Sequence, residues 1–329
     1  MGSKQAVLEF VIGHILDLEG DTILDAFSGS GCIAYALKAL GKRVIANDYL
    51  HFAYHIAKAT IENDSVTLGE DDISQLLRFN RRAKHFIRRT FSGLYFSEAE
   101  CSFLDHAYAN ICAIRNPFKR SLALASLCRA CMKKRPRGIF TFVGRKGWDK
   151  RKDLRMSMED QFVRAISEFN ASVFSNKRKN RAMCSDVFAL PPSRADIVYM
   201  DTPYVSPHSD CDYTRRYHFV EGLCRYWEGV EIQTETTTKK IKSYPTAFSS
   251  SKTVYESFLR LFRHFRDCKL VISYGSNGIP NREEMTALLR EVKKNVKVVE
   301  TSHKYCFGNH RHKVGDNNNE VKEYLFIGT

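Results

Sequence analysis

The sequence predicts an α/β fold in which a mostly parallel sheet is interrupted by an inserted, mainly helical domain. The first observation is a strand, a glycine-rich turn and a helix in succession within residues 22–40. The second is an apolar strand, Val198 to Met200, that runs straight into a polar turn. The third is the stretch 66–175, in which the alternation of strand and helix stops. Alternating strands and helices are typical of parallel sheets, so the segments on either side of this stretch should share one sheet.

The first predicted element is an amphipathic helix over residues 4–18, with Lys4 at its start. A strand over 22–27 follows, and the turn 28–31 then opens a helix over 32–40. Glycine in a turn between strand and helix lets the backbone approach a bound nucleotide closely. The sequence therefore predicts a nucleotide-type ligand at this turn.

A second strand over 43–47 ends on Asp48. An acid about twenty residues after a glycine turn is where nucleotide-binding α/β folds place a ribose-binding carboxylate, so Asp48 is the candidate for that role. Residues 29–34 also fit the loose G-x-G-x-x-[GA] dinucleotide pattern. That pattern alone is weakly specific, and an NAD enzyme stays open as an alternative at this point.

After a predicted helix over 51–63, the stretch 66–175 is helical, aromatic and basic. The whole chain carries a formal net charge of +14, and residues 78–155 hold 20 Lys/Arg against 5 Asp/Glu. Three basic runs lie here, at 79–89, 133–137 and 145–152. Single charge runs are usually solvated helix faces, but three runs interleaved with aromatic residues favour a nucleic-acid surface.

The strand and helix rhythm returns near 180–184, in a strand leading to Asp186 and Val187. The remaining predicted elements are the strand before Asp201, a helix within 210–227, a polar loop over 230–251, helices over 252–267 and 281–293, and strands over 270–273, 296–300 and 322–327. The last strand follows its predecessor without an intervening helix. We therefore expect it to enter the sheet antiparallel.

The turn after the strand Val198 to Met200 reads Asp201, Thr202, Pro203 and Tyr204. Ligands of open α/β sheets bind at the carboxyl ends of the strands, which places a carboxylate and an aromatic ring at the mouth of a site. A planar substrate bearing an amine, such as an unstacked nucleobase, would satisfy these groups together. The alternative is an acid that caps a helix in any α/β enzyme.

Composition limits the remaining possibilities. Hydrophobic residues make up 43% of the 329, which indicates a globular core, and no run approaches the ~18 apolar residues of a membrane span. The N-terminus lacks an apolar signal core, so we expect a cytoplasmic protein with reduced cysteines. Cys128 and Cys131 have no matching second pair and are predicted to be packing residues. Ligand types also occur in a basic loop at His303, Cys306, His310 and His312, and the prediction is that no metal is bound.

These motifs, in this order, resemble those of the DNA adenine-N6 methyltransferases in which the cofactor motif precedes a target-recognition domain and then the catalytic motif. The resemblance covers most of the chain. Its one departure is that the usual Asp-Pro-Pro-Tyr tetrapeptide has Thr202 at its second position. The chemistry asks that position only for a backbone carbonyl, which threonine supplies, while one ring that fixes φ is lost.

The resemblance implies a Rossmann-like methyltransferase sheet and a site for S-adenosylmethionine. Residues 1–65 and 176–329 would form the catalytic domain and 66–175 an inserted target-recognition domain. By similarity, the methionine part of the cofactor would be held by Lys4, Phe27, Ser28, Gly29 and Gly31, the ribose by Asp48, and the adenine by Asp186 and Val187. The catalytic residues would be Asp201, Thr202, Pro203 and Tyr204.

The implied activity is transfer of one methyl group to the N6 amino group of adenine in duplex DNA, with the base flipped out of the helix. A restriction endonuclease of matching specificity is an expected partner, and no membrane is. The candidate DNA contacts are Arg81, Arg82, Arg88, Arg89, Lys133, Lys134, Arg135, Arg145, Lys146, Arg215 and Arg216.

Three related activities and one non-enzymatic role are alternatives. Cytosine-C5 methylation needs a nucleophilic cysteine, normally in a Pro-Cys pair, and the sequence has no such pair. Cytosine-N4 methylation uses a similar loop that more often begins with serine, so Asp201 favours adenine. RNA adenine methylation would typically place asparagine there. A DNA-binding module with a relic cofactor fold is the remaining alternative, although no motif position is visibly lost.

Overall fold

The computed structural model describes residues 4–144, 151–205, 212–244, 246–248, 250–304 and 320–329. The chain divides into two compact units. One, the helical unit, consists of Leu50–Ser175 and Tyr213–Tyr244. The other, the sheet unit, consists of Gly2–Tyr49, Asn176–Asp212 and Pro245–Thr329.

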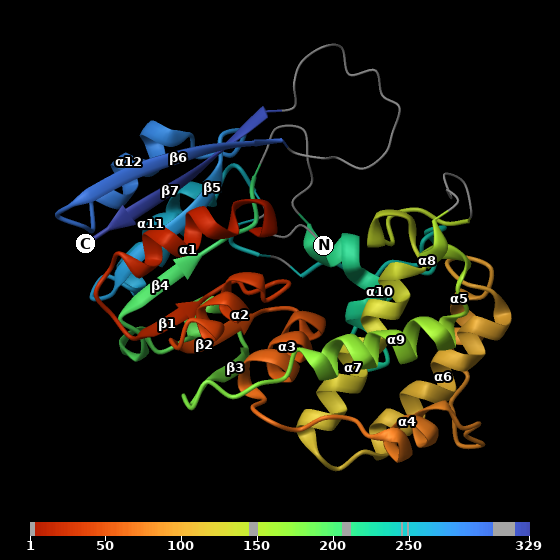
Figure 1. The fold of residues 1–329 in the computed structure, drawn as a ribbon. Helices are drawn as coiled ribbons and strands as arrows, with labels where there is room; N and C mark the ends of the chain where they lie inside the picture. The colour runs from red at the N-terminus through yellow and green to blue at the C-terminus, as the bar shows by residue number, and fades with distance from the viewer. Residues whose placement is uncertain (1–3, 145–150, 206–211, 245, 249, 305–319) are drawn as a thin grey trace. The chain divides into compact units, whose positions relative to one another are not determined.

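The described part of the sheet unit contains a seven-stranded sheet in the order β3-β2-β1-β4-β5-β7-β6 (Figure 1). The strands are β1 (Thr22–Asp25), β2 (Arg43–Asp48), β3 (Arg181–Cys184), β4 (Ile197–Met200), β5 (Lys269–Gly275), β6 (Val296–Lys304) and β7 (Glu320–Gly328). Strands β1 to β5 pair in parallel, whereas β7 pairs antiparallel with both β5 and β6. The predicted antiparallel final strand is confirmed.

The register of the central strands brings the polar strand ends together. Asp25, the last residue of β1, lies opposite Ala46 of β2 and Tyr199 of β4. All four residues of β4 are buried, as expected for a parallel strand covered on both faces. The turn after β1, the end of β2 and the turn after β4 therefore meet at one edge of the sheet.

Helices on the sheet unit follow their apolar periodicity. They are η1 (Lys4–Val7), α1 (Leu8–Leu16), α2 (Cys32–Ala39), α11 (Val254–His264) and α12 (Arg282–Arg290), with short 3-10 turns η4 (Val187–Ala189) and η5 (Pro192–Arg194). In α11, Val254, Phe258, Leu261 and Phe262 form one buried stripe. Helix α12 packs against β6 and β7, and α2 packs against β2.

The helical unit is built around α7, which packs against α3, α6, α9 and α10. Its elements are α3 (His51–Ala57), the π-helix η2 (Lys58–Glu62), α4 (Glu70–Leu77), α5 (Phe86–Phe91), α6 (Glu98–Ala113), α7 (Pro117–Lys133), η3 (Pro136–Gly138), α8 (Lys152–Arg155), α9 (Met158–Ala171) and α10 (Tyr213–Arg225). Ten residues of α7 are buried, so this helix is nearly surrounded by protein.

The helical unit is larger than the insert 66–175 that the sequence predicts. It also includes residues 50–65 and 213–244, which the prediction assigns to the catalytic domain. The reason is packing: α3 and α10 contact each other and α7. An amphipathic pattern shows that a helix has an apolar face but does not show which core that face joins.

The cysteines of α7 and the candidate metal ligands are the next features that the sequence singled out. Cys128 and Cys131 are fully buried in α7, which confirms their role as packing residues. Among the described residues, no group of three or more His, Cys, Asp or Glu is placed to hold a metal ion. The side chains of His303, Cys306, His310 and His312 lie outside the described part of the chain. None of the helices described is long and apolar enough to cross a membrane.

Candidate active site

The glycine loop lies between β1 and α2 and is tied to the end of β2. Gly29 and Gly31 have φ values of 50° and 74°, a region in which a side chain would be strained. The N–H of Ser28 donates to the carbonyl of Asn47, and the N–H of Gly29 donates to the Asp48 carboxylate, both at 2.8 Å. A methyl group added at Gly29 would meet only the carbonyl oxygen of Phe27, at 3.9 Å. The loop therefore offers open backbone next to a carboxylate.

Asp25, at the end of β1, is a member of this site that the sequence reasoning missed. The residue is 1% exposed, and within the described structure its Oδ1 has no hydrogen-bond partner. Burial raises the pKa of this carboxyl to about 8, and the nearby charges of Asp201 and Asp48 contribute to the rise. The signal in the sequence is an acid inside an otherwise apolar strand, directly before the glycine loop.

The predicted catalytic loop follows β4. The Asp201 side chain is 28% exposed, and its Oδ1 accepts a hydrogen bond from the Tyr204 hydroxyl at 3.1 Å. The Tyr204 ring packs edge-on against Tyr274, with ring centroids 4.7 Å apart. Thr202 is 2% exposed, and among the described residues its hydroxyl has no partner. Asp201 and Tyr204 are thus fixed to each other at the carboxyl end of a buried strand.

Lys4 and Glu323 complete this network from opposite ends of the sequence. The Nζ of Lys4 lies 3.3 Å from Asp201 Oδ1 and 2.5 Å from Glu323 Oε1, and it also contacts the Tyr204 hydroxyl. Glu323 of β7 is 3% exposed, and its Oε1 accepts from the Ser273 hydroxyl at 2.6 Å and lies 3.0 Å from the Tyr204 hydroxyl, whose one proton can go to Glu323 or to Asp201. The structure therefore places Lys4 against the Asp201 to Tyr204 loop, whereas the prediction gives it to the methionine part of the cofactor.

The charges in this network shift the pKa values of its members. Removal from water raises the pKa of Asp201; Lys4 opposes that rise and Glu323 adds to it. Burial alone would lower the pKa of Lys4, but the charges of Asp201 and Glu323 bring it above its ordinary value. Lys4 therefore stays protonated near neutral pH and keeps its attraction for both carboxylates.

The third predicted region, Asp186 and Val187, lies beside a group of aromatic rings. The Asp186 carboxylate is exposed and accepts from the N–H of Phe188 at 2.9 Å, while Val187 is buried. The Phe188 ring lies parallel to that of Phe248, with centroids 6.2 Å apart, and Arg260 stacks 4.0 Å above Phe188. Phe248 and Arg260 come from distant segments, and no local sequence motif marks them.

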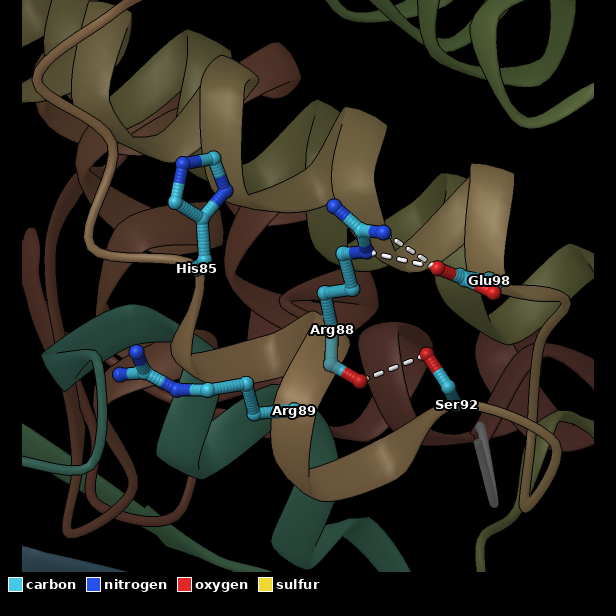
Figure 2. Close-up of a pocket in the computed structure, with 5 residues that line it drawn as sticks. All are labelled: His85, Arg88, Arg89, Ser92 and Glu98. Carbon is cyan, nitrogen blue, oxygen red and sulfur yellow. Dashed lines mark hydrogen bonds and ion pairs between the residues drawn. The ribbon is translucent and has the colours of Figure 1, made fainter.

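The predicted DNA contacts of the 81–89 segment lie on the surface of the helical unit, where Arg81, Arg82, Arg88 and Arg89 are all exposed. A pocket of about 410 Å³ is lined by His85, Arg88, Arg89, Ser92 and Glu98 (Figure 2). Figure 2 shows the Arg88 guanidinium directed at Glu98, which it meets at 2.9 Å through Nε, while Arg89 extends to the other side. One of these arginines is therefore already paired with a carboxylate.

The structure corrects the prediction for Lys134 and Arg135 of the run 133–137. Arg135 is 1% exposed, and its guanidinium donates to the carbonyl oxygens of Phe142 and Gly144, so it is not available to DNA. The Lys134 side chain is 7% exposed and pairs with Glu100 at 2.7 Å. Lys133 remains 40% exposed but pairs with Asp153 at 3.0 Å. Buried cations here bind carbonyl and carboxylate groups of the fold, which a charge count does not distinguish from a surface patch.

The other predicted DNA contacts lie in two places, the segment 145–146 and helix α10. Arg145 and Lys146 lie outside the described residues. Arg215 of α10 is exposed, and the Arg216 guanidinium stacks 5.8 Å above the Tyr213 ring. Arg215 thus keeps the exposure that a phosphate contact requires.

The sheet order, the glycine loop after β1 and the acid-to-tyrosine loop after β4 together define a Rossmann-like methyltransferase. A family model described as D12 class N6 adenine-specific DNA methyltransferase matches residues 1–288. The chain belongs to this family. It is an enzyme that methylates adenine in DNA and requires a methyl donor. Family membership therefore sets aside four alternatives: an NAD enzyme, a cytosine-N4 methyltransferase, an RNA methyltransferase and a relic DNA-binding module.

Known Type II methyltransferases and a modification methylase are similar to this chain. Over 324 residues it is 30% identical to the Type II methyltransferase M2.HphI of Haemophilus parahaemolyticus, covering 93% of this chain and 90% of that protein. It is 26% identical to the modification methylase StsI of Streptococcus sanguinis and 24% identical to the Type II methyltransferase M.FokI of Planomicrobium okeanokoites. These matches cover 99% and 88% of this chain but only 51% and 46% of the two relatives.

Proposed function

We propose that this enzyme uses S-adenosylmethionine to methylate the N6 amino group of a flipped adenine in double-stranded DNA, at one recognised sequence. The observation that carries the proposal is the Asp201 carboxylate, fixed by Lys4 and Tyr204 at the strand end next to the glycine loop. An acceptor placed in this way suits an exocyclic amine. The same edge of the sheet holds the groups that would bind the cofactor.

The residues present fit S-adenosylmethionine, which carries a ribose, an adenine and positive charges. Open backbone at Gly29 and the adjacent Asp48 suit the ribose end. The buried Asp25, with an oxygen that lacks a partner within the described residues, suits a hydrogen-bond donor of the cofactor. The rings of Phe188 and Phe248, beside Asp186, offer apolar surface for the adenine. Asp48 and Asp186 are therefore kept as ligands of ribose and adenine.

Asp201 and Thr202 would activate the adenine amine. When bound, S-adenosylmethionine supplies an electrophilic methyl group. The adenine amine is a poor nucleophile because its lone pair is delocalised into the ring. Hydrogen bonds from its two N–H groups to the Asp201 carboxylate and the Thr202 carbonyl favour a more tetrahedral nitrogen, and the carboxylate stabilises the positive charge that develops during transfer.

Tyr204 would receive the flipped base. Extrusion of a base from the duplex costs a few kcal/mol. Stacking of the base on an aromatic side chain recovers ~1–3 kcal/mol of that cost. Pro203 fixes the backbone immediately before the ring, and the hydroxyl contacts with Asp201 and Glu323 hold the ring in one orientation. The ring is therefore ordered before the base arrives.

The helical unit would hold the DNA. Its surface segment 79–89 carries Arg81, Arg82 and Arg89, together with Phe79, which is 72% exposed and whose ring lies tilted against that of His106, with centroids 4.4 Å apart. Cations neutralise phosphates, and an exposed ring can contact sugars or bases. Arg88, Lys133, Arg215 and Arg216 are weaker candidates of the same kind.

The assay that tests this proposal incubates labelled S-adenosylmethionine with duplex DNA, single-stranded DNA and RNA in parallel, followed by digestion to nucleosides and mass spectrometry. We expect label only as N6-methyladenine and mainly from duplex DNA. Label in N4-methylcytosine, or label from RNA alone, would overturn the proposal. A methylation map of DNA from expressing cells identifies the recognised sequence, and protection of that DNA from a candidate endonuclease tests for a restriction partner.

A further inference from the structure

Glu323 lies in the interior of the sheet, in contact with the catalytic loop. Its strand, β7, is paired on both sides, and Glu323 faces Gly275 of β5 and Thr301 of β6 in the two registers. A glutamate that is 3% exposed costs free energy unless donors surround it. The donors here come from three segments: Lys4 at 2.5 Å, the Ser273 hydroxyl at 2.6 Å and the Tyr204 hydroxyl at 3.0 Å.

All three donors converge on one atom, Oε1. A carboxylate oxygen accepts several hydrogen bonds, and one of the three donors to Oε1 is the Lys4 ammonium, so this contact is a charge-assisted ion pair. Glu323 therefore acts as a second negative charge in a network that contains Asp201.

Glu323 and Asp201 compete for the same two donors. The Tyr204 hydroxyl has one proton and two carboxylate acceptors, Asp201 at 3.1 Å and Glu323 at 3.0 Å. Lys4 is nearer to Glu323, at 2.5 Å, than to Asp201, at 3.3 Å. Within the described structure, both of these contacts of Asp201 are made by Oδ1, the oxygen that faces Lys4 and Tyr204.

We propose that Glu323 is a positioning residue for the methyl transfer. It attracts the Lys4 ammonium more strongly than Asp201 does and holds the Tyr204 hydroxyl. As a result, the Asp201 carboxylate remains a strong acceptor for the substrate amine. The inference rests on the proposed role of Asp201. Without the Glu323 charge, the Lys4 ammonium and the Tyr204 hydroxyl would both interact with the Asp201 carboxylate alone. The carboxylate would then be a weaker acceptor, because its charge is already neutralised.

The pH dependence of the rate reports this coupling. The groups that face Asp201 are Lys4 from η1, Asp25 from β1, Tyr199 from β4, Tyr204 from its own loop and Glu323 from β7. Among them, the charge of Glu323 raises the pKa of Asp201. The rate falls at low pH when Asp201 is protonated, so removal of that charge should move the acid limb of kcat to lower pH.

The experiment compares Glu323→Gln with the parent enzyme and with Glu300→Gln. Glutamine keeps the size and a carbonyl acceptor but loses the charge. We expect kcat to fall about tenfold or more, consistent with loss of roughly one charged hydrogen bond, with KM for DNA and cofactor affinity changed less than about threefold. The acid limb should move to lower pH. Glu300, on β6, pairs with Lys322 at the surface, and its variant should match the parent.

Two further results test the role of Glu323. If Glu323→Gln melts at a much lower temperature, Glu323→Asp, which keeps the charge, should retain the acid limb of the parent enzyme even though kcat is lower. An acid limb that stays in place in a folded Glu323→Gln variant, or an unchanged kcat, would overturn the role of Glu323. If the parent enzyme itself does not methylate adenine, it is the proposed function that fails.

Discussion

The backbone N–H of Gly29 donates to the carboxylate of Asp48 at 2.8 Å, and this bond joins the glycine loop to the end of the neighbouring strand. It fixes the loop while leaving the Asp48 carboxylate at the same edge as Asp25 and Asp201. The Asp48 carboxylate thus shapes the glycine loop, and in the proposed function it also binds the ribose.

The first prediction concerns Asp48→Ala. Loss of charge-assisted bonds to the ribose, worth ~1.5–3 kcal/mol, should weaken S-adenosylmethionine binding about tenfold or more. Calorimetric titration measures the affinity. Asp267→Ala, which removes an acid with an 87% exposed side chain from the same unit, is the control and should bind as the parent does. Equal affinities in the two variants would remove Asp48 from the cofactor site.

A second prediction concerns Asp201→Ala. Transfer should be abolished, because the amine loses its charged acceptor, while calorimetry should show cofactor affinity near that of the parent. DNA binding should also persist, since Tyr204 can still stack on the base. Duplex DNA carrying 2-aminopurine at the target position should still gain fluorescence with Asp201→Ala and should not with Tyr204→Ala. Residual transfer above a few per cent would mean that another group activates the amine.

The parts of the site that could be predicted from the sequence are those formed by local motifs. The glycine loop and the Asp201 to Tyr204 loop are each a few consecutive residues with fixed turn chemistry, and a parallel sheet brings strand ends together. The sheet class and its antiparallel last strand follow from the same patterns. In contrast, Lys4 and Glu323 are 319 residues apart in the chain, and their contact depends on how η1 and β7 pack in the folded protein, which no local motif shows.

The basic segment shows that local charge does not predict which arginines are buried. Its charge predicts a DNA-binding surface, and Arg81 and Arg82 are exposed as expected. Arg135 has the same charge and sits in an equally basic run, yet it is buried against backbone carbonyls. Burial depends on which loops fold over a helix end. Local composition does not contain that information, so each arginine needs its tertiary surroundings before a role is assigned.

A third prediction tests the exposed arginines. Reversal of Arg81 and Arg82 to Glu should weaken DNA binding and reduce its salt dependence by about 0.9 in the logarithmic slope for each phosphate that these arginines neutralise in the parent. Cofactor affinity should be unchanged. The matched control reverses Arg263 and Arg266, whose side chains are 63% and 72% exposed in the sheet unit. The same salt slope in both double variants would mean that Arg81 and Arg82 only face solvent.

A fourth prediction uses the pocket in Figure 2. Glu98 holds the Arg88 guanidinium through Nε at 2.9 Å, as an anion would. Glu98→Gln removes this competitor, so DNA should bind more tightly, by about threefold or more, with a slope steeper by up to ~0.9. Fluorescence anisotropy at several salt concentrations measures both. Glu168→Gln, which frees Arg129 from a similar pair in the same unit, is the control. Unchanged or weaker binding by Glu98→Gln would exclude Arg88 as a phosphate contact.

The fifth prediction concerns stability and pH. The pKa of Asp25 is about 8 in the folded protein, because of burial and then Asp201 and Asp48, against an ordinary value of 3.8. Between these values the folded state binds a proton that the unfolded state has lost, so the stability that Asp25 contributes is full below about pH 4 and is lost as pH rises to 8. The slope approaches about 1.4 kcal/mol per pH unit.

Asp25→Asn removes this titration while keeping the size of the side chain. Without cofactor, its melting temperature should therefore rise relative to the parent as pH increases from 5 to 8, by on the order of 2 °C per pH unit. The difference should level off above pH 8, where the parent carboxyl is ionised in both states. Asp267→Asn, at an exposed position, should follow the parent at every pH. A constant difference between Asp25→Asn and the parent would show that Asp25 is ionised throughout this range, and its carboxylate would then already be stabilised by groups of the folded protein.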